Sequence, residues 1–448
     1  MKKKLLSFLM LFVLLPLSSC GDEGPIFTKG DGSESNPYII ETSDQIRRLC
    51  DIFYTEPENY FKANYLLAND IDLSGFPISS IGSNFEYPFN GVFDGGGHKI
   101  SGYSIGKYVK NAGLFAILGD EAVVKNLNVY VDFSRGGVGY NAGAIAGTTS
   151  SGSLIENCEV VGRMEYDVNT FSSKSVETSM NVYSDYPCYT SAVGGIVGVN
   201  AGTIKNCKSS IQLSGDIVGG ICGTSCGKVI SCETSNSSFK GRDIVGGIVG
   251  YSFNSNVTYS SALNVEGKTS QIFGGIIGVA NYSTEVNCCQ FVGKANLVKS
   301  QYQYSVGSVI GKTVTRILNA GLIKEITKAF TTIKNTISSF ICNISNENKC
   351  VIAVPETTSA FTASSNCIAF ISLSNKERQS NVEIKSTIKT NEIYVPSYYQ
   401  HKTDSEYLFG QENISAIATK LGQQESDFIK IENSEIYGYY LKNITKES

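Results

Sequence analysis

One pentapeptide recurs along the middle of the 448-residue chain and constrains the fold more than any other feature. The closing glycines of its four clear copies are spaced by 25, 27 and 28 residues. Looser copies lie at 143–147 and 307–311, and a degenerate first copy lies at 112–115. The four clear copies are Gly194-Gly195-Ile196-Val197-Gly198, Gly219-Gly220-Ile221-Cys222-Gly223, Gly246-Gly247-Ile248-Val249-Gly250 and Gly274-Gly275-Ile276-Ile277-Gly278. A period of this length is the signature of a protein built from stacked repeats.

Two further elements keep step with the pentapeptide. A polar residue followed by cysteine begins 8 to 10 residues after a closing glycine, in Asn157-Cys158, Asn206-Cys207, Ser231-Cys232 and Asn287-Cys288. A single glycine then follows, at Gly162, Gly215, Gly241, Gly267 and Gly293. Each repeat therefore predicts a short strand, a turn, a second strand and a return to the next glycine pair. The cysteines follow this repeat, which favours buried thiols in register over disulfide pairing.

The repeat length indicates how the strands are arranged. About 25 residues at roughly 3.3 Å each form one coil of short strands, and coils stacked about 4.8 Å apart pair their backbones. The sequence thus predicts an all-β fold, a right-handed parallel β-helix with short capping helices. Isoleucine and valine fill its interior, glycines lie where coils approach closely, and asparagine and cysteine form ladders along one edge.

These copies, followed by Asn-Cys, resemble GLUG motifs, and the segment before them resembles the usual preface to such repeats. The preface pieces are Asn36-Pro37-Tyr38-Ile39-Ile40, Asn69-Asp70-Ile71-Asp72-Leu73 and the segment 89–100. The resemblance covers roughly residues 30 to 311. It implies a surface-associated, often adhesive β-solenoid of Bacteroidota-like or Gram-positive bacteria, such as lies beside the catalytic unit of IgA-specific metallopeptidases. It carries no catalytic residue with it.

The first residues predict an exported lipoprotein. A basic start at Lys2–Lys4 precedes the apolar run Leu5–Leu17, and Leu17-Ser18-Ser19-Cys20 resembles a lipobox. We therefore expect a signal peptide over 1–19, lipidation at Cys20 and a tether over 20–35; the alternative is an ordinary secretory signal. The acidic pair Asp22-Glu23 resembles a surface-export signal, which favours an outer-membrane lipoprotein at the cell surface, held in the membrane by its lipid.

Three further segments complete the predicted organisation: a cap and first coils over 36–110, GLUG-like coils over 111–311, and a distinct C-terminal part over 312–448. In the first, Thr42 and Gln45 form a capping-box pattern for a helix whose apolar face is Ile46, Leu49, Cys50 and Phe53. In the last, apolar residues at three- and four-residue spacing predict amphipathic helices over 314–342. These helices either bind a membrane or partner or, as we favour, pack against the solenoid. Strands and a closing cap, with a helix over 414–421, are expected after them.

The sequence contains no recognisable catalytic motif. With 37 basic and 41 acidic residues there is no electrostatic footprint for nucleic acid, and the only histidines, His98 and His401, form no His-Glu-x-x-His motif. Asp70 and Asp72 share a strand face, as a carbohydrate-active enzyme would need, but we expect them to bond to turns. The clear repeats are interpreted as short of acidic residues at matching positions. The cluster Cys222, Cys226 and Cys232 lacks the spacing of a metal site, so no catalytic residue, metal or cofactor is predicted.

Tyrosines are the candidate binding residues. Tyr183, Tyr186 and Tyr189 lie in an insertion over about 165–192, and Tyr302 and Tyr304 precede the last copy. Such rings stack on sugars or anchor protein partners, although they also pack on flanks. The leading hypothesis is a non-enzymatic surface adhesin that binds a host glycan or matrix protein. A β-helix lyase or glycosidase and a passive structural envelope protein are the alternatives.

Overall fold

The structure is a computed structural model of the whole chain, and its description is confined to part of it. The described residues are 25–75, 77–105, 109–132, 141–165, 191–281, 283–298, 304–314, 331–344, 350–354, 362–365, 367–373, 382–386, 392–395, 408–409, 414–431, 438–442 and 444.

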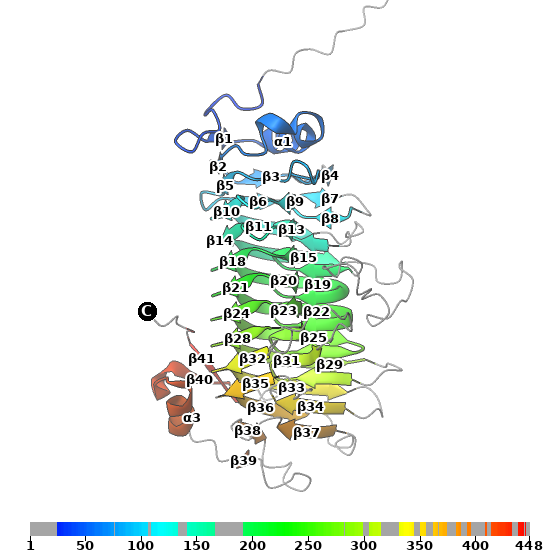
Figure 1. Ribbon diagram of the computed structural model, residues 1–448, viewed down its shortest axis with the longest axis vertical. Helices are drawn as coiled ribbons and strands as arrows, with labels where there is room; N and C mark the ends of the chain where they lie inside the picture. The colour runs from blue at the N-terminus through cyan, green and yellow to red at the C-terminus, as the bar shows by residue number, and fades with distance from the viewer. Residues whose placement is uncertain are drawn as a thin grey trace, which may run out of the picture.

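The described chain forms a parallel β-solenoid, as the repeat predicts, with the turns stacked along one long axis (Figure 1). Every pairing between its described strands is parallel except for one C-terminal hairpin, β40 with β41. Three sheets run along the solenoid, and the 7-stranded one is confined to its central turns. A typical turn passes from the 7-stranded sheet through the 11-stranded sheet to the 19-stranded sheet, and then returns through the pentapeptide.

The 7-stranded sheet contains the strands that begin in the pentapeptides: β9 (Phe115–Leu118), β13 (Ala146–Thr149), β17 (Val197–Asn200), β20 (Cys222–Ser225), β23 (Val249–Phe253), β27 (Ile277–Asn281) and β31 (Ile310–Val314). The 11-stranded sheet is made of short strands: β1 (Tyr38–Ile40), β2 (Tyr65–Leu67), β5 (Val92–Asp94), β10 (Val123–Lys125), β14 (Leu154–Glu156), β18 (Thr203–Lys205), β21 (Lys228–Ile230), β24 (Asn256–Thr258), β28 (Glu285–Asn287), β32 (Thr331–Lys334) and β35 (Thr362–Ser365).

The 19-stranded sheet carries the longest strands and the ends of the solenoid. Its members are β3 (Ile71–Asp72), β6 (Lys99–Ser101), β8 (Asn111–Ala112), β11 (Asn128–Asp132), β12 (Asn141–Gly143), β15 (Glu159–Glu165), β16 (Ala192–Gly194), β19 (Lys208–Gly219), β22 (Glu233–Gly246), β25 (Ser261–Thr269), β26 (Ile272–Gly274), β29 (Gln290–Leu297), β30 (Tyr304–Gly307), β33 (Ile337–Ile344), β34 (Cys350–Val354), β36 (Ile368–Leu373), β37 (Val382–Ser386), β38 (Glu392–Val395) and β39 (Leu408–Phe409). A small pair, β4 (Pro77–Ile78) with β7 (Ser104–Ile105), completes the N-terminal turns.

The first glycines of the pentapeptides form one column across the turns. Gly143, Gly194, Gly219, Gly246, Gly274 and Gly307 pair in register. The chain reverses so tightly here that a Cβ added at Gly219 would lie 2.1 Å from the carbonyl oxygen of Cys222. Glycine is therefore required by the close backbone approach rather than by a positive φ. The isoleucine two residues later is buried in every clear copy, as predicted.

The predicted polar and cysteine ladders form the corner between the 11- and 19-stranded sheets. The polar residue of each corner has a left-handed backbone conformation, with φ of 55° at Asn157 and 54° at Asn206. The side chains form a ladder, in which Asn206 Nδ2 donates to Asn157 Oδ1 at 3.4 Å. We call the buried cysteines that follow the thiol column: Cys158, Cys207, Cys232, Cys289 and Cys367. The Cys207 thiol donates to the Ile155 carbonyl of the preceding turn at 3.7 Å.

Two details of the predicted register are wrong. Cys288, with φ of 51°, takes the polar corner position and Cys289 the buried one, so the motif read as Asn287-Cys288 is shifted by one residue. The single glycines that follow the polar residue and cysteine of each repeat do not form a column either. Gly215 pairs with Gly241, but Gly267 pairs with Phe239. The cause is that longer turns absorb extra residues as β-bulges, which slide this part of the strand.

The N-terminal cap is present as predicted. Helix α1 (Ser43–Thr55) starts with a capping box between Thr42 and Gln45 and lies above the first turns (Figure 1). Its buried residues are the four predicted: Ile46, Leu49, Cys50 and Phe53. The single turn η1 (Pro57–Asn59) follows it. Among the described residues, no helix is both long and apolar enough to cross a bilayer.

The prediction of helices over 314–342 is wrong for the part that the structure describes. Thr331–Lys334 and Ile337–Ile344 are strands β32 and β33, which continue the solenoid. Ile333 points into the core, whereas Ile337 packs against the C-terminal segment on the outside. Because both faces of this part are buried, the apolar residues do not alternate, and their spacing resembles that of a helix. The intervening residues 315–330 lie outside the described residues.

The C-terminal segment has the predicted helix but a different position. Helix α3 (Ile414–Leu421), the turn η4 (Glu425–Asp427) and the hairpin β40 (Phe428–Lys430) with β41 (Tyr439–Leu441) lie beside the solenoid in Figure 1 rather than over its end. They pack on the outer face of β33 and β36, against Ile337, Ile368 and Phe370. Leu441 exchanges two hydrogen bonds with the Gln290 side chain, at 2.8 and 3.1 Å. We call this segment, residues 414–444, the C-terminal clamp.

Candidate functional site: the outer faces of the solenoid

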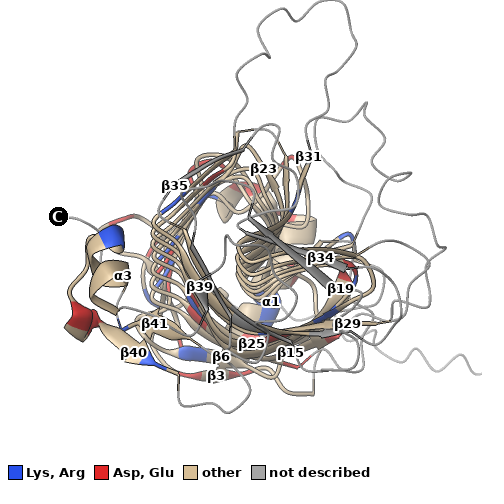
Figure 2. Ribbon diagram, turned by 90° about the horizontal axis from the view of Figure 1, so that it is seen from below, with Lys and Arg blue, Asp and Glu red and all other residues tan. Residues whose placement is uncertain are grey.

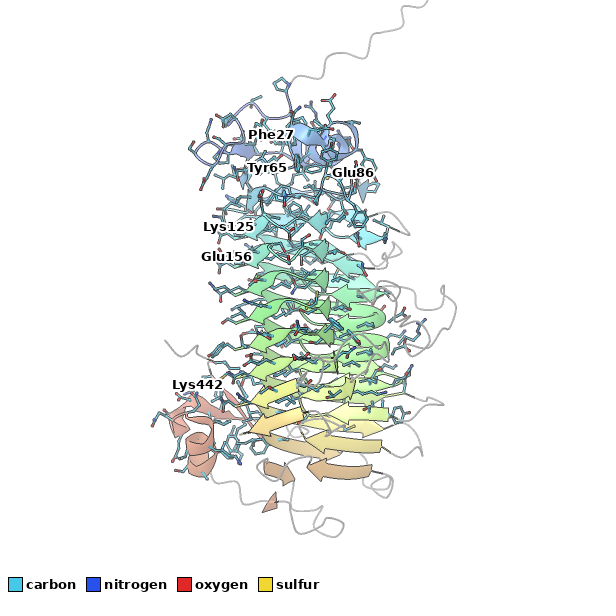
Figure 3. All side chains as sticks on the ribbon, viewed as in Figure 1. Phe27, Tyr65, Glu86, Lys125, Glu156 and Lys442 are labelled. Carbon is cyan, nitrogen blue, oxygen red and sulfur yellow. The ribbon has the colours of Figure 1, made fainter. Side chains whose placement is uncertain are left out.

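Charged residues alternate in sign on the outer face of the 11-stranded sheet. Asp94, Lys125, Glu156 and Lys205 occupy one column on successive turns. Lys125 Nζ lies 3.5 Å from Asp94 Oδ2, and Figure 3 shows Lys125 and Glu156 one above the other at the edge of the solenoid. Seen along the axis, charged positions recur along the stacked sheets (Figure 2). Since opposite charges directly across strands attract, the alternation of sign in this column favours the observed register.

The outer face of the 19-stranded sheet carries an exposed apolar pair near its N-terminal end. Tyr130 and Val161 are partners on neighbouring turns, and they are 47% and 39% exposed. The ion pair between Arg163 and Asp132, 3.3 Å apart, lies beside them. Further along, the same face is covered by the C-terminal clamp. The uncovered stretch thus presents an aromatic ring and a pair of opposite charges side by side.

A buried charged cluster lies where β19, β22 and β26 approach their pentapeptides. Asp216 and Asp243 are 5% and 3% exposed and occupy equivalent positions on neighbouring turns. The Arg242 guanidinium lies 3.2 Å from Asp216 and 3.3 Å from Asp243, and the Gln271 amide donates to Asp243 at 2.6 Å. Arg242 is one of the two extra residues of this turn, since a bulge separates the pairs Gly215–Gly241 and Ile217–Ile244 and a second bulge lies earlier in the same strand. The insertion thus supplies the counter-charge.

The electrostatics of this cluster depart from those of surface carboxylates. Burial raises the pKa of Asp216 to about 6, although the Arg242 charge opposes the effect. Burial also raises the pKa of Asp243. Among the described residues, neither Asp216 Oδ1 nor the nearby buried hydroxyl of Ser191 has a hydrogen-bond partner. The cluster is therefore held in its charged form at a cost, and its carboxylates are screened from solvent.

This cluster corrects the interpretation that the repeats lack acidic residues at matching positions. Asp216-Ile217-Val218-Gly219 and Asp243-Ile244-Val245-Gly246 are the same tetrapeptide, and each begins with an aspartate. The signal was present in the sequence. It was obscured because the residue before each aspartate differs, being Gly215 in one turn and the inserted Arg242 in the next.

The acidic pair considered for an enzyme has a structural role instead. Asp70 accepts a hydrogen bond from the Lys99 backbone at 2.9 Å and lies 3.4 Å from His98 Nδ1. Asp72 accepts from the backbone and hydroxyl of Ser74 at 2.9 and 2.6 Å. These bonds hold the pKa of both carboxyls below the usual value. Both side chains therefore bond to turns, as predicted from the sequence.

The remaining candidates are dispersed. Cys222 belongs to the 7-stranded sheet and Cys232 to the thiol column, and within the described residues no three His, Cys, Asp or Glu side chains gather as a metal site would require. Tyr304 is 2% exposed and donates to the Val298 carbonyl at 2.6 Å, so it is not available to a ligand. The lipidation residue Cys20, the tyrosines Tyr183, Tyr186 and Tyr189, and Tyr302 and His401 lie outside the described residues.

Comparison with known proteins supports the repeat assignment. The model of the GLUG motif matches residues 189–214, which include the pentapeptide Gly194–Gly198 and the corner Asn206-Cys207. The chain therefore carries a GLUG motif within a parallel β-solenoid, as the resemblance in its sequence indicated.

Two curated proteins share part of the sequence. A protein of Evansella cellulosilytica, named as a proposed Gly-rich membrane protein, is 30% identical over 123 residues, which are 25% of this chain and 13% of that protein. Halomucin of Haloquadratum walsbyi is 34% identical over 115 residues, 24% of this chain and 1% of that protein. This chain thus spans only a small part of the length of either relative.

A solved structure also resembles the chain. It is that of a protein of Bacteroides ovatus proposed to be an immunoglobulin A1 protease, with 16% sequence identity and a TM-score of 0.40. The match covers 94% of this chain and 97% of that one.

Proposed function

We propose that this protein is a non-enzymatic, lipid-anchored surface protein that binds a host glycan or a matrix protein through the outer faces of its solenoid. The observation that carries the proposal is the long, regular outer surface, on which charged side chains such as Asp94 and Lys125 line up from turn to turn and the Tyr130 ring lies exposed. A rigid scaffold with such columns suits recognition of an extended or repeating partner, because neighbouring contacts need no ordering on binding.

The envelope location rests on separate evidence. The segment 1–20 has the features of a lipoprotein signal ending at Cys20, and about two acyl chains are enough to hold a protein on a membrane. One partial relative is named as a membrane protein. We therefore expect Cys20→Ala to abolish fatty-acid labelling and to move the protein out of the membrane fraction. Continued labelling of the variant would contradict the anchor.

Binding is tested with residues 21–448, which contain every described element. The fragment is applied to printed host glycans, plant and microbial polysaccharides, and purified matrix proteins. Saturable binding to a defined set of spots is the expected result. An array without a single saturable spot, from a fragment whose circular dichroism confirms β structure, would favour a passive structural role in the envelope.

The enzyme alternative has its own test. Asp216 and Asp243 are paired carboxylates on adjacent turns, the arrangement that a β-helix glycosidase would use. Both are screened from solvent and bound to Arg242, which argues against access by a substrate. We expect no release of reducing ends or unsaturated products from polysaccharides. Release that disappears in both Asp216→Asn and Asp243→Asn would establish the enzyme instead.

A further inference from the structure

An open polar pocket of about 370 Å³ lies where the 7-stranded sheet turns into the 11-stranded sheet. It spans the three successive turns that contain β24, β28 and β32. Asn256, Glu285 and Thr332 form one column on the outer face of these strands, and Lys334 lies two residues further along β32. Asn254 and Ser283, from the corners before β24 and β28, line the other side.

The backbone around the pocket is well fixed. The hydroxyl of Thr284, at the buried edge, bonds with that of Ser252 at 2.9 Å. The amide of Glu285 donates to the Ser255 carbonyl at 3.0 Å, and the Thr332 amide donates to the Thr284 carbonyl at 2.8 Å. The side chains that line the pocket thus project from a hydrogen-bonded ladder, which limits the entropy lost when a ligand binds.

The polar side chains of the pocket are not committed to one another. In the described part of the chain, Asn254, Asn256, Glu285 and Lys334 make no side-chain hydrogen bond or ion pair. Higher on the same sheet the charges are paired, as in Lys125 with Asp94. An ammonium, a carboxylate and two amides therefore face one pocket with free donors and acceptors.

This chemistry selects the ligand. The lining is formed by amides, hydroxyls and one charge of each sign, so it disfavours an apolar molecule or a strongly charged one. A volume near the lower end of the range for small-molecule sites suits one or two sugar rings rather than a longer chain. Adjacent sugar hydroxyls each donate and accept, which matches a carboxylate acceptor, an ammonium donor and amides that do both.

We propose that this pocket binds the terminal, hydroxyl-rich residue of a neutral glycan, with Glu285 and Lys334 as its principal contacts and Asn254 and Asn256 beside them. The inference rests on the proposed glycan-binding function and assigns the site of that function to described residues, away from the tyrosines that the sequence analysis selected.

The test uses residues 21–448 on the printed glycan array, followed by titration of the glycans that bind. The pocket variants are Glu285→Gln, Asn256→Ala and Lys334→Ala. The controls are Glu156→Gln and Lys205→Ala, which occupy the column of Lys334 on earlier turns, and Lys228→Ala, which occupies the column of Glu285. All six change outward-facing side chains, and an unchanged thermal melt confirms that each variant is folded.

We expect Glu285→Gln and Lys334→Ala each to weaken binding of a neutral glycan by about tenfold or more, since each removes a hydrogen bond to a charged group, while the controls stay within about twofold. If the wild type binds and the pocket variants bind equally well, the pocket is overturned and the binding function stands. If only polyanionic glycans bind, and Lys205→Ala weakens their binding as much as Lys334→Ala does, the interaction is a general electrostatic attraction to the surface. The pocket is again overturned. If the wild type binds no glycan, the proposed glycan-binding function fails and the pocket fails with it.

Discussion

Replacing Asp216 by asparagine should make the protein more stable at neutral pH, although the substitution removes half of an ion pair. Burial raises the pKa of Asp216 to about 6 in the folded protein, against an ordinary value of 3.8. An acid whose pKa is raised by folding takes up its proton more readily in the folded state. The free energy of unfolding therefore falls as the pH rises through the interval between about 4 and 6. Above that interval the buried, charged carboxylate lowers the free energy of unfolding by an amount that no longer changes with pH.

The size of the cost follows from the gap between the two pKa values. A gap of about two units, at roughly 1.36 kcal/mol per unit, corresponds to about 3 kcal/mol. This is an upper limit, because asparagine does not reproduce every contact of a protonated carboxyl. Arg242 keeps Asp243 as its partner in the variant, so no buried charge is left alone.

The assay is urea unfolding followed by tyrosine fluorescence, which the 25 tyrosines and the absence of tryptophan make convenient. At pH 7.5, Asp216→Asn should unfold at higher urea than the wild type, and at pH 4 the two should nearly coincide. Asp132→Asn is the control, since Asp132 pairs with Arg163 on the exposed surface and should shift stability by less than about 1 kcal/mol at either pH. If the variant is less stable than the wild type at pH 7.5, the ion pair between Asp216 and Arg242 outweighs the cost of burying the carboxylate, contrary to this prediction.

Three further predictions concern the scaffold. Gly219→Ala should destabilise the protein by about 3 kcal/mol or more, because the new Cβ would lie 2.1 Å from a backbone oxygen, whereas Thr203→Ala on the outer face should be nearly neutral in the same urea titration. Burial raises the pKa of the Cys289 thiol to about 12, so a thiol reagent at pH 8 should label the thiol column only in denaturant. The partly exposed Cys226 should react faster than the column in the native protein, and rapid native labelling of the column would contradict its burial. Deleting the C-terminal clamp should expose the apolar face of β33 and β36, so that the truncated protein associates in size-exclusion chromatography and binds a hydrophobic dye. A monomeric truncated protein that binds no dye would show that the clamp covers no exposed apolar surface.

The parts of the fold that depend on local chemistry could be predicted from the sequence. The column of Gly194 and Gly219 follows from the recurrence of the pentapeptide, and the α1 cap follows from Thr42 and Gln45. In each case the residues that contact one another lie within a few positions in the chain, so the local sequence is enough to predict the contact. The buried cysteine corner was predicted for the same reason, apart from the slip of one residue at Cys288.

The parts that depend on long-range packing could not be predicted. The place of the C-terminal clamp is set by Gln290 and Phe370, which lie far from Leu441 in the chain, and nothing local to the clamp indicates which face it covers. The same clamp buries Ile337 from outside and thereby turns a strand pattern into an apparent helix. The pocket was missed because Asn254 and Lys334 meet only when three turns are stacked in register.

The most direct test of the account is made on intact cells. Cells producing the wild-type protein, Cys20→Ala, or no protein are applied to surfaces coated with the glycans or matrix proteins found on the array. We expect wild-type cells to adhere, soluble fragment 21–448 to compete with them, and cells producing Cys20→Ala to adhere no better than cells without the protein. Equal adhesion of all three would contradict the central claim that this solenoid is a surface-anchored binding protein.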